Sequence, residues 1–256
     1  GVNKATSRRK AKLEVRLARP ADAPGIVALV ERVYADRMSG YSRDMIRAQI
    51  NNYPEGQFVA LYEGTIVGYC ASMRLDERLA LSQHGWEEIT NDGFGSRHDP
   101  TGDWLYGYET CVDPEARGVR IGQRLYDARK ALAERLELKG IVFGARMPSY
   151  ARNRRKVKGP EDYLEKVLAG VIRDPTIGFQ VRNGFEPVGV LKDYLPEDKQ
   201  SAGLAAHMVW RNPYVDPDEP PRFRVPRDVE SVRIATCQFQ ARAVKSFEEF
   251  IHNVEY

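Results

Sequence analysis

The chain has 256 residues, of which 42% are hydrophobic and 29% charged, a balance typical of a globular protein that buries a core without crosslinks. Its formal charge of +3 is too small a basic excess for a dedicated nucleic-acid binder. Three widely spaced cysteines, Cys70, Cys111 and Cys237, fit neither a disulfide framework nor a zinc site, and they favour a reducing, cytoplasmic setting. No apolar run approaches the roughly 18 residues that span a membrane, so we expect no membrane partner.

The predicted elements follow one another without an internal repeat. Residues 1–12 are polar and basic and lack the apolar core of a secretory signal, so we expect a flexible tail. Next we expect, in order, a strand at 14–19, a helix from Pro20 to about Val33, a helix at Ser42–Asn52, and strands at Phe58–Tyr62 and Ile66–Met73. Ser42 stands where a helix N-cap is needed, and Glu63-Gly64 predicts a hairpin turn between the two strands.

A glycine-rich, irregular insertion is expected at residues 77–103, with one short helix near Arg78–Trp86. After it we expect, in order, a strand at Trp104–Val112, a helix at Ile121–Leu138, a strand at Ile141–Ala145, a basic insertion at 147–173 that becomes helical near Glu161–Ile172, a helix at Asp174–Asn183, and strands at Phe185–Leu191 and Ala205–Trp210. Gly140 stands at the C-cap position of the longest helix. Strands joined by helices predict an α/β fold with a mixed sheet of about seven strands.

The composition changes after Trp210. Residues 213–228 contain five prolines and predict an extended linker. Residues 232–239 (VRIATCQF) then predict a buried strand, and residues 246–254 predict the start of a helix. A domain should not end on one unsupported strand and helix, so we expect the sequence to be part of a longer chain.

The junction between the strand at Trp104–Val112 and the following helix is the chemically most informative segment. A strand that enters a helix through a turn leaves the first helical amides unpaired, at the positive end of the helix dipole. A diphosphate can bind there through backbone N–H groups alone. Gly118 and Gly122 remove side chains where such an anion must approach closely.

The segment RGVRIG, Arg117–Gly122, resembles the R/Q-x-x-G-x-G/A motif of the Gcn5-related N-acetyltransferases (GNAT family). The preceding VDPEARG and the later NGFEPVG, Asn183–Gly189, are also typical of that family. The likeness covers about Glu14–Trp210 apart from the two insertions, so we assign residues 13–212 to a GNAT domain. The sequence departs from the motif at its first glycine, which is Arg120 here.

The resemblance implies a GNAT fold whose fourth and fifth strands splay apart in a V that holds acetyl-coenzyme A. The diphosphate would bind to the motif, and an N–H group near Val112 would polarise the thioester carbonyl. The residues that the resemblance assigns to cofactor binding are Val112, Arg117, Gly118, Val119, Arg120, Ile121, Gly122 and Gln123. The acceptor amine would attack the thioester directly, without an acyl-enzyme.

An alkyl amine has a pKa of about 10 and must lose a proton before it attacks. Glu109 is our candidate base, with Tyr108 as a second candidate, although a solvated or ion-paired strand residue is an equally good reading of Glu109. Neighbouring strand residues point to opposite faces unless a bulge intervenes. The tyrosine that is the usual general acid of the family is replaced by Gln180, so the proton for the leaving thiolate is left to Tyr150, to Tyr108 or to solvent.

The sequence leaves two functions open. The first is an N-acetyltransferase for a primary amine of a small molecule or peptide. Residues 229–256 resemble the opening of the carbon–nitrogen hydrolase (nitrilase) family, so the second is a non-catalytic acyl-coenzyme-A-binding module linked to a hydrolase. We expect no nucleic-acid partner, because the basic run at Arg152–Lys158 is best explained as a solvated loop. The four scattered histidines predict no metal site, and whether the chain forms a homo-oligomer is left open.

Overall fold

The computed structural model describes residues 13–34, 40–116, 120–216 and 218. By its internal contacts the chain divides into two units, Gly1–Glu219 and Pro220–Tyr256. The second unit lies outside the described residues, as do the basic tail and most of the proline-rich segment. The domain boundaries predicted for these parts therefore stay predictions, and every element named below belongs to the first unit.

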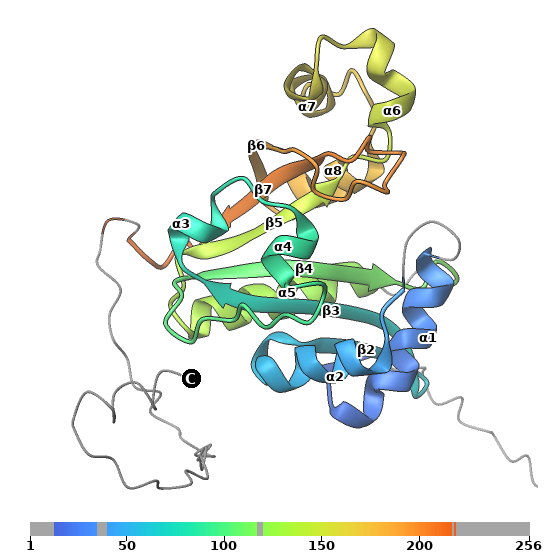
Figure 1. Cartoon of the computed structure of the whole chain (residues 1–256), viewed down its shortest axis with the longest axis vertical. Coiled ribbons are helices and arrows are strands. Elements are labelled where there is room, and N and C mark those ends of the chain that lie inside the picture. Colours follow the sequence, from blue (N-terminus) through green and yellow to red (C-terminus); the bar gives the residue numbers. More distant parts are fainter. Residues whose placement is uncertain (1–12, 35–39, 117–119, 217, 219–256) are drawn as a thin grey trace, which may run out of the picture. The chain divides into compact units, whose positions relative to one another are not determined.

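A seven-stranded mixed sheet forms the centre of this unit (Figure 1). Its strands are β1 (Leu13–Leu17), β2 (Phe58–Tyr62), β3 (Thr65–Leu75), β4 (Trp104–Val112), β5 (Gly140–Arg146), β6 (Glu186–Leu191) and β7 (Ala205–Arg211). Their order across the sheet is β1-β2-β3-β4-β5-β7-β6. Only β4 and β5 pair in parallel, and every other neighbouring pair is antiparallel. The predicted α/β fold with about seven strands is confirmed.

Helices cover both faces of the sheet (Figure 1). They are α1 (Ala23–Tyr34), α2 (Arg43–Asn52), α3 (Glu77–Ala80), α4 (Trp86–Thr90), α5 (Ile121–Arg135), α6 (Tyr150–Asn153), α7 (Pro160–Leu168) and α8 (Pro175–Arg182). One buried cluster joins α1 and α2 to one face of the sheet, while α5 and α8 pack against the other face in separate clusters. Side chains of β4 therefore face either the α1 side or the α5 side.

The helix boundaries confirm one local prediction and correct two. The Ser42 hydroxyl accepts a hydrogen bond from the Met45 amide at 3.1 Å, as expected of an N-cap. The insertion at 77–103 holds two short helices, α3 and α4, where we expected one. The C-cap assigned to Gly140 is wrong, because Leu136 caps α5 and Gly140 begins β5. Glycine is needed at position 140 since a Cβ there would lie 2.2 Å from the Trp210 carbonyl oxygen.

A β-bulge interrupts the pairing of β3 with β4. Ala71 lies opposite Glu109 and Ser72 lies opposite Gly107, so Tyr108 is one residue more than β3 can pair. The extra residue changes the alternation along β4, and Tyr108 and Glu109 both face the α1 side. Strand alternation predicts opposite faces for these two side chains unless a bulge intervenes, and the structure contains that bulge.

The parallel strands β4 and β5 separate shortly after they begin. Their pairing consists of Trp104–Gly140, Leu105–Ile141 and Tyr106–Val142, and it stops there. The second half of β4 then diverges from β5, which continues to pair with β7 over its full length. The structure thus contains the V-shaped splay expected between the fourth and fifth strands.

Two side chains satisfy backbone carbonyls that the bulge and the splay leave without a strand partner. The Trp86 indole donates a hydrogen bond to the Tyr108 carbonyl at 2.9 Å. The Arg129 guanidinium of α5 donates to the Ala71 carbonyl at 2.6 Å and to the Glu109 carbonyl. Arg129 is only 2% exposed, and no carboxylate pairs with it among the described residues. Its burial is explained by these carbonyls, because unpaired buried acceptors are costly.

We predict that Arg129→Met lowers the free energy of unfolding by about 2–4 kcal/mol, since it leaves two buried carbonyls without donors. Urea unfolding followed by circular dichroism measures this loss. Arg135→Met is the matched control, because Arg135 lies on the same helix but is 64% exposed beside Glu55. That variant should stay within about 0.5 kcal/mol of the parent. Equal effects of the two substitutions would contradict the role given to Arg129.

Candidate functional site

A cavity of about 580 Å³ opens where β4 and β5 separate. This volume is typical of ligand-binding pockets in proteins. The residues that line it from the α5 side of the sheet are Gly107, Thr110, Val112, Gly122, Tyr126, Arg129, Phe143, Ala145, Pro175, Thr176, Phe179 and Gln180. Those that line it from the α1 side include Tyr34, Tyr41, Met45, Trp86, Glu87, Asp92, Tyr108, Glu109, Arg146, Tyr194 and Glu197. The cavity therefore passes through the gap in the sheet and is reached from both faces.

The first turn of α5 forms one end of the cavity. Gly122 lines it, and a Cβ at this position would lie 3.2 Å from the Phe179 ring. No side chain of the described residues caps this helix end, so the amides of Ile121, Gly122 and Gln123 have the free donors expected of an uncapped N-terminus. The Gln123 side-chain amide donates a hydrogen bond to Asp127 along the helix at 2.9 Å.

The residue before α5 adopts an unusual backbone conformation. Arg120 has φ 52° and ψ 40°, in the left-handed region that favours glycine. This conformation explains why the resemblance places a glycine here, and it costs an arginine about 1 kcal/mol. Arg120 stands at the edge of the described residues, and Arg117, Gly118 and Val119 lie outside them. The roles predicted for these three stay predictions.

Glu109 lies on the α1 side of the cavity, held by two tyrosines. Tyr34 of α1 donates a hydrogen bond to Glu109 Oε1 at 2.6 Å, and Tyr41 donates to Oε2 at 2.9 Å. Burial raises the pKa of the Glu109 carboxyl, while the two tyrosine hydroxyls oppose that shift. No basic side chain of the described residues forms an ion pair with Glu109, so the ion-paired reading of this residue is not supported.

Tyr108 contributes differently from Glu109. Its ring is buried and lines the cavity, but its hydroxyl points to the turn at Gly95, where an added Cβ would lie 2.6 Å from it. Burial raises the pKa of Tyr108 well above its usual range. Its carbonyl is taken by Trp86. Tyr108 thus shapes the cavity wall, and Glu109 is the better proton acceptor of the two.

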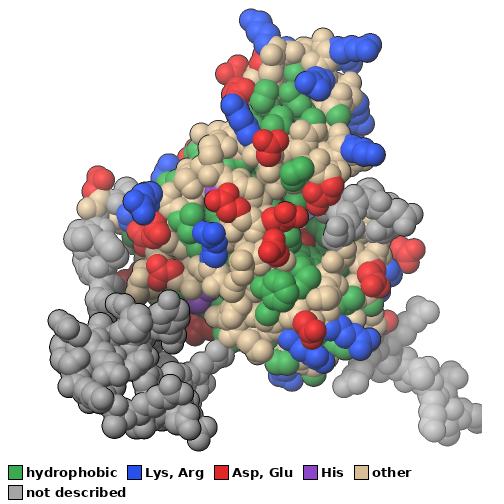
Figure 2. Space-filling view, in the orientation of Figure 1, with side chains coloured by type: hydrophobic (Ala, Val, Ile, Leu, Met, Phe, Trp, Pro, Cys, Tyr) green, Lys and Arg blue, Asp and Glu red, His purple; other side chains and the backbone are tan. Residues whose placement is uncertain are grey.

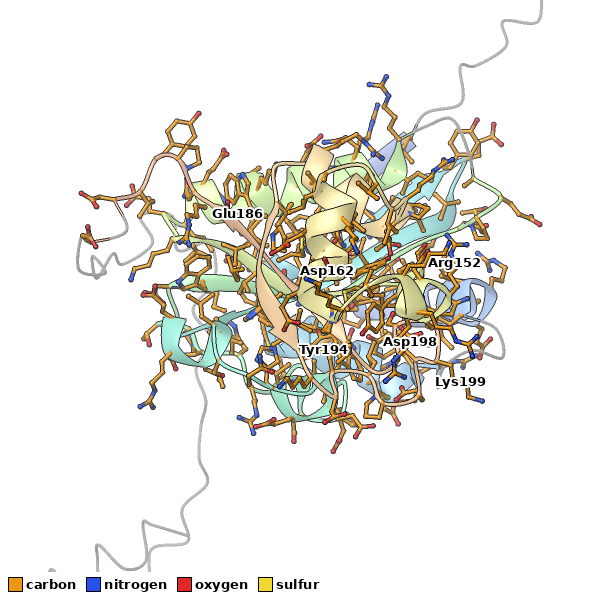
Figure 3. The ribbon with its side chains drawn as sticks, turned by 90° about the horizontal axis from the view of Figure 1, so that it is seen from above. Arg152, Asp162, Glu186, Tyr194, Asp198 and Lys199 are labelled. Atoms are coloured by element: carbon orange, nitrogen blue, oxygen red, sulfur yellow. The ribbon has the colours of Figure 1, made fainter. Side chains whose placement is uncertain are left out.

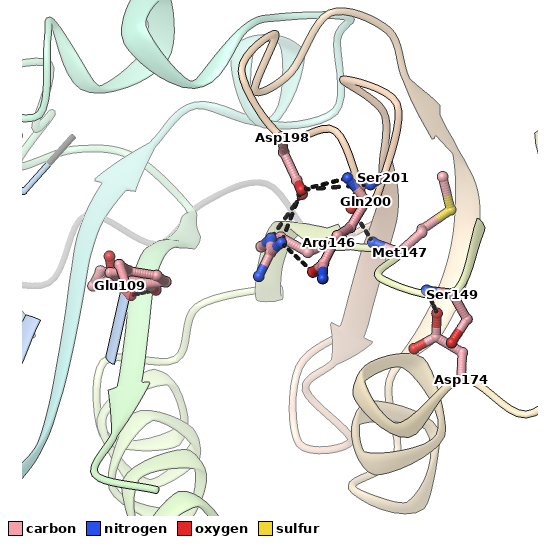
Figure 4. Close-up of polar contacts among 9 residues, drawn as sticks. Glu109, Arg146, Met147, Ser149, Asp174, Asp198, Gln200 and Ser201 are labelled. Atoms are coloured by element: carbon pink, nitrogen blue, oxygen red, sulfur yellow. Dashed lines mark hydrogen bonds and ion pairs between the residues drawn. The ribbon is translucent and has the colours of Figure 1, made fainter. Parts of the chain in front are cut away.

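An ion pair faces Glu109 across the cavity. Arg146 of β5 donates two hydrogen bonds to the Asp198 carboxylate, at 2.7 and 2.8 Å (Figure 4). Asp198 is 3% exposed, and burial opposes but does not overcome the effect of Arg146, which keeps the pKa of Asp198 below its ordinary value. The charge of Arg146 is thereby balanced inside the protein. Arg146 therefore adds no net positive charge to the β5 wall of the cavity.

Tyr194 reaches the cavity from the loop between β6 and β7, the loop that also carries Asp198 (Figure 3). Its hydroxyl bonds to the Tyr106 hydroxyl at 3.1 Å, which bonds to His84 Nε2 at 2.6 Å. His84 Nδ1 lies 2.9 Å from the Ser82 carbonyl, an obligate acceptor, so Nδ1 carries the proton. Burial lowers the pKa of His84 to about 4, so the ring is neutral at pH 7 and Nε2 accepts. Tyr194 must then donate to Tyr106, so its hydroxyl proton is directed into the core and away from the cavity.

Carboxylates surround the α1 side of the cavity. Glu87, Asp92 and Glu197 line its exposed rim, in addition to Glu109 inside. Figure 2 shows acidic side chains gathered beside hydrophobic ones in the middle of the face turned to the viewer. With Arg146 neutralised by Asp198, this side of the cavity carries a negative charge and offers hydrogen-bond acceptors.

The remaining sequence candidates lie elsewhere. Tyr150 is buried against Tyr163, with ring centroids 5.2 Å apart, and does not line the cavity. The basic run at 152–158 lies on α6 and the turns after it. The described residues contain no group of three or more acidic, histidine or cysteine side chains placed to hold a metal ion. None of their helices has the length and apolar character that crossing a membrane requires.

Comparison with known proteins agrees with this geometry. The family model described as "Acetyltransferase (GNAT) family" matches residues 26–154. The chain is 36% identical over 245 residues to a "Probable hydrolase YhcX" of Bacillus subtilis (strain 168), covering 96% of this chain but only 47% of that relative. It is 30% identical over 172 residues to the "Uncharacterized N-acetyltransferase YkwB" of the same organism, covering 67% of this chain and 75% of YkwB. The chain therefore spans about half the length of YhcX.

Solved structures extend the comparison. The "GphF GNAT-like decarboxylase in complex with isobutyryl-CoA" superposes with a TM-score of 0.69 at 30% identity, covering 78% of this chain and 99% of that one. The loading GNATL domain of CurA from Lyngbya majuscula superposes with a TM-score of 0.67, covering 78% of this chain and 98% of that domain, and at 20% identity it shows the fold alone. This chain belongs to the GNAT acetyltransferase family.

We predict that Tyr34→Phe and Tyr41→Phe each raise the pKa of the Glu109 carboxyl. Both hydroxyls donate to the carboxylate, so their removal destabilises the ionised form. The titration of the Glu109 side-chain carboxyl carbon by NMR measures the change, with Glu109→Gln to assign the signal. Tyr150→Phe serves as the control, because Tyr150 is buried away from the cavity. An unchanged Glu109 titration in both cavity variants would contradict this arrangement.

Proposed function

We propose that the chain is an acetyl-coenzyme-A-dependent N-acetyltransferase that transfers the acetyl group directly to a primary amine of a small molecule or peptide. One observation carries the proposal. One cavity joins a helix N-terminus that no described side chain caps, on one face of the sheet, to a partly buried carboxylate on the other face. Each end suits one of the two substrates.

The α5 end suits coenzyme A. Its free amides and the helix dipole favour a diphosphate, and Gly122 leaves the helix surface open for close approach. The gap between β4 and β5 would admit the pantetheine arm, with Val112 at its entrance. The related protein GphF is in complex with isobutyryl-CoA, which supports an acyl-coenzyme A as the ligand class.

The α1 end suits an amine. The negative rim of Glu87, Asp92 and Glu197 attracts an ammonium ion. Glu109 lies where it can take the proton that the ammonium must lose before attack, and burial raises its pKa toward that of a useful base. Loss of Glu109 is expected to slow transfer because general base catalysis typically contributes about 10²–10⁴-fold.

Direct transfer is favoured over an acyl-enzyme by the state of the cysteines. Cys70 and Cys111, the two in the described part of the chain, are both buried. Burial raises the pKa of each thiol, so neither is a ready thiolate at neutral pH. The amine itself is therefore the nucleophile in this proposal.

A non-catalytic acyl-coenzyme-A-binding module of a longer carbon–nitrogen hydrolase is the second candidate. It is favoured by Gln180 at the position of the usual general acid, and by the relative YhcX, a probable hydrolase about twice as long as the aligned region. Measured acetyl transfer distinguishes the transferase from the non-catalytic module. A panel of amines with acetyl-coenzyme A should yield free thiol, whereas tight coenzyme binding without turnover would support the module. Because GphF is named a decarboxylase, the assay should also follow carbon dioxide release from carboxylated acyl-coenzyme A.

We predict that Gly122→Asp abolishes coenzyme A binding, with a loss of at least about 100-fold in affinity. The new side chain would contact the Phe179 ring and place a negative charge where the diphosphate binds. Isothermal titration calorimetry with acetyl-coenzyme A measures the affinity of each variant.

Gly189→Asp is the matched control for this change. Gly189 is exposed on the edge strand β6, and nothing lies within 4 Å of an added Cβ. That variant should bind like the parent. Retained affinity in a folded Gly122→Asp protein would overturn the position proposed for the diphosphate.

A further inference from the structure

The proposed transfer ends with a thiolate that needs a proton, and Gln180 cannot supply one. The sulfur of the bound thioester would lie along the path from the first turn of α5 to Glu109. A general acid must therefore come from the α5 side of the cavity, close to the point where β4 and β5 diverge. The described tyrosines on the opposite face are poorly placed for this role.

The hydroxyl groups of those tyrosines already contact other parts of the protein. Tyr34 and Tyr41 donate to Glu109, and Tyr194 donates toward Tyr106. The Tyr108 hydroxyl lies against the turn at Gly95. Each of these protons is directed away from the expected position of the sulfur.

Tyr126 stands on the α5 side, four residues after Gly122. Positions i and i+4 of a helix lie on one face, and Arg129 continues the same face three residues later. All three residues line the cavity. They form a row along α5 from the proposed diphosphate site to the splay beside Glu109. The pantetheine arm and its sulfur would follow this row, which brings Tyr126 next to the sulfur.

The surroundings hold the Tyr126 ring in place and direct its hydroxyl. The ring packs against Phe143, Phe179 and Phe185, with centroid distances of 6.1, 5.4 and 5.4 Å. Its hydroxyl interacts with Gln180 and Thr110, which both line the cavity. The hydroxyl end of Tyr126 therefore faces the cavity, while its ring is fixed in the core.

Three neighbours make this hydroxyl a better acid than burial alone would allow. Burial raises the pKa of Tyr126, while the charge of Arg129 and the interactions with Gln180 and Thr110 oppose that shift. Gln180 also has a buried side-chain oxygen without a hydrogen-bond partner among the described residues. The glutamine at the usual acid position thus supports a tyrosine on the neighbouring helix.

We propose that Tyr126 is the general acid that protonates the leaving sulfur of coenzyme A, an inference that rests on the proposed transferase function. When the tetrahedral intermediate collapses, the carbon–sulfur bond breaks and its electron pair goes to sulfur. The Tyr126 O–H proton moves to that sulfur, and the phenolate is left beside Arg129. The proton that the amine nitrogen loses on forming the amide restores the phenol through solvent in the cavity, so no net proton is consumed.

We predict that Tyr126→Phe lowers kcat for acetyl transfer by about 100-fold or more while the Kd for coenzyme A changes less than about twofold. The same variant should raise the pH at which the thiol of bound coenzyme A ionises, because a donor to the thiolate is lost. The ultraviolet absorbance of the thiolate reports this second effect without any turnover. Thermal unfolding of each variant establishes that it is folded.

Tyr150→Phe is the matched control, since it removes a buried tyrosine hydroxyl outside the cavity. Its kcat and its thiol ionisation should equal those of the parent. If the parent turns over but folded Tyr126→Phe keeps its rate and thiol titration, Tyr126 is not the acid. If the parent binds coenzyme A and acetylates no amine, the transferase proposal fails instead, and the thiolate titration still decides whether Tyr126 contacts the sulfur.

Discussion

Buried backbone carbonyls at a break in the sheet must find donors, and this requirement governs the site. The pairing between β4 and β5 ends after three residue pairs, and the bulge at Tyr108 disturbs the pairing with β3 on the other side. Arg129 and Trp86 supply the missing donors from opposite faces of the sheet. Because these side chains satisfy the carbonyls, the strands can stay apart and a cavity can pass through the centre of the fold.

The same break separates the two halves of the chemistry. The α5 side presents helix amides, an aromatic wall and Tyr126, which suit a long anionic thioester and its leaving group. The α1 side presents carboxylates and tyrosine oxygens, which suit an ammonium ion. The bulge turns Glu109 toward the α1 side, while its carbonyl is bonded by Arg129 from the α5 side. In the proposed reaction, Tyr126 and Glu109 would thus lie on opposite sides of the reacting carbon as proton donor and proton acceptor.

The splay is expected only from the resemblance to the GNAT family, whereas local sequence patterns are sufficient to predict the strands and the position of the helix N-terminus, because these depend on periodicity and on glycine at Gly122. They do not predict that Tyr108 and Glu109 share a face, since nothing in WLYGYETCV marks a bulge. Nor do they join Glu109 to Tyr34, 75 residues away, or find the hydrogen bonds that orient Tyr194. Arg129 looks like a solvent-facing helix residue until the carbonyls that it satisfies are seen.

The most direct test of the account is a crystal structure with a ketone analogue of acetyl-coenzyme A, in which a methylene group separates sulfur from the carbonyl. We expect the diphosphate on the amides at the start of α5 and the analogue's carbonyl carbon in the gap between β4 and β5. Glu109 and Tyr126 should then lie on opposite sides of the acyl group, within reach of reacting atoms at about 3–4 Å. An analogue bound outside the gap, or with Glu109 and Tyr126 both remote from it, would contradict the account.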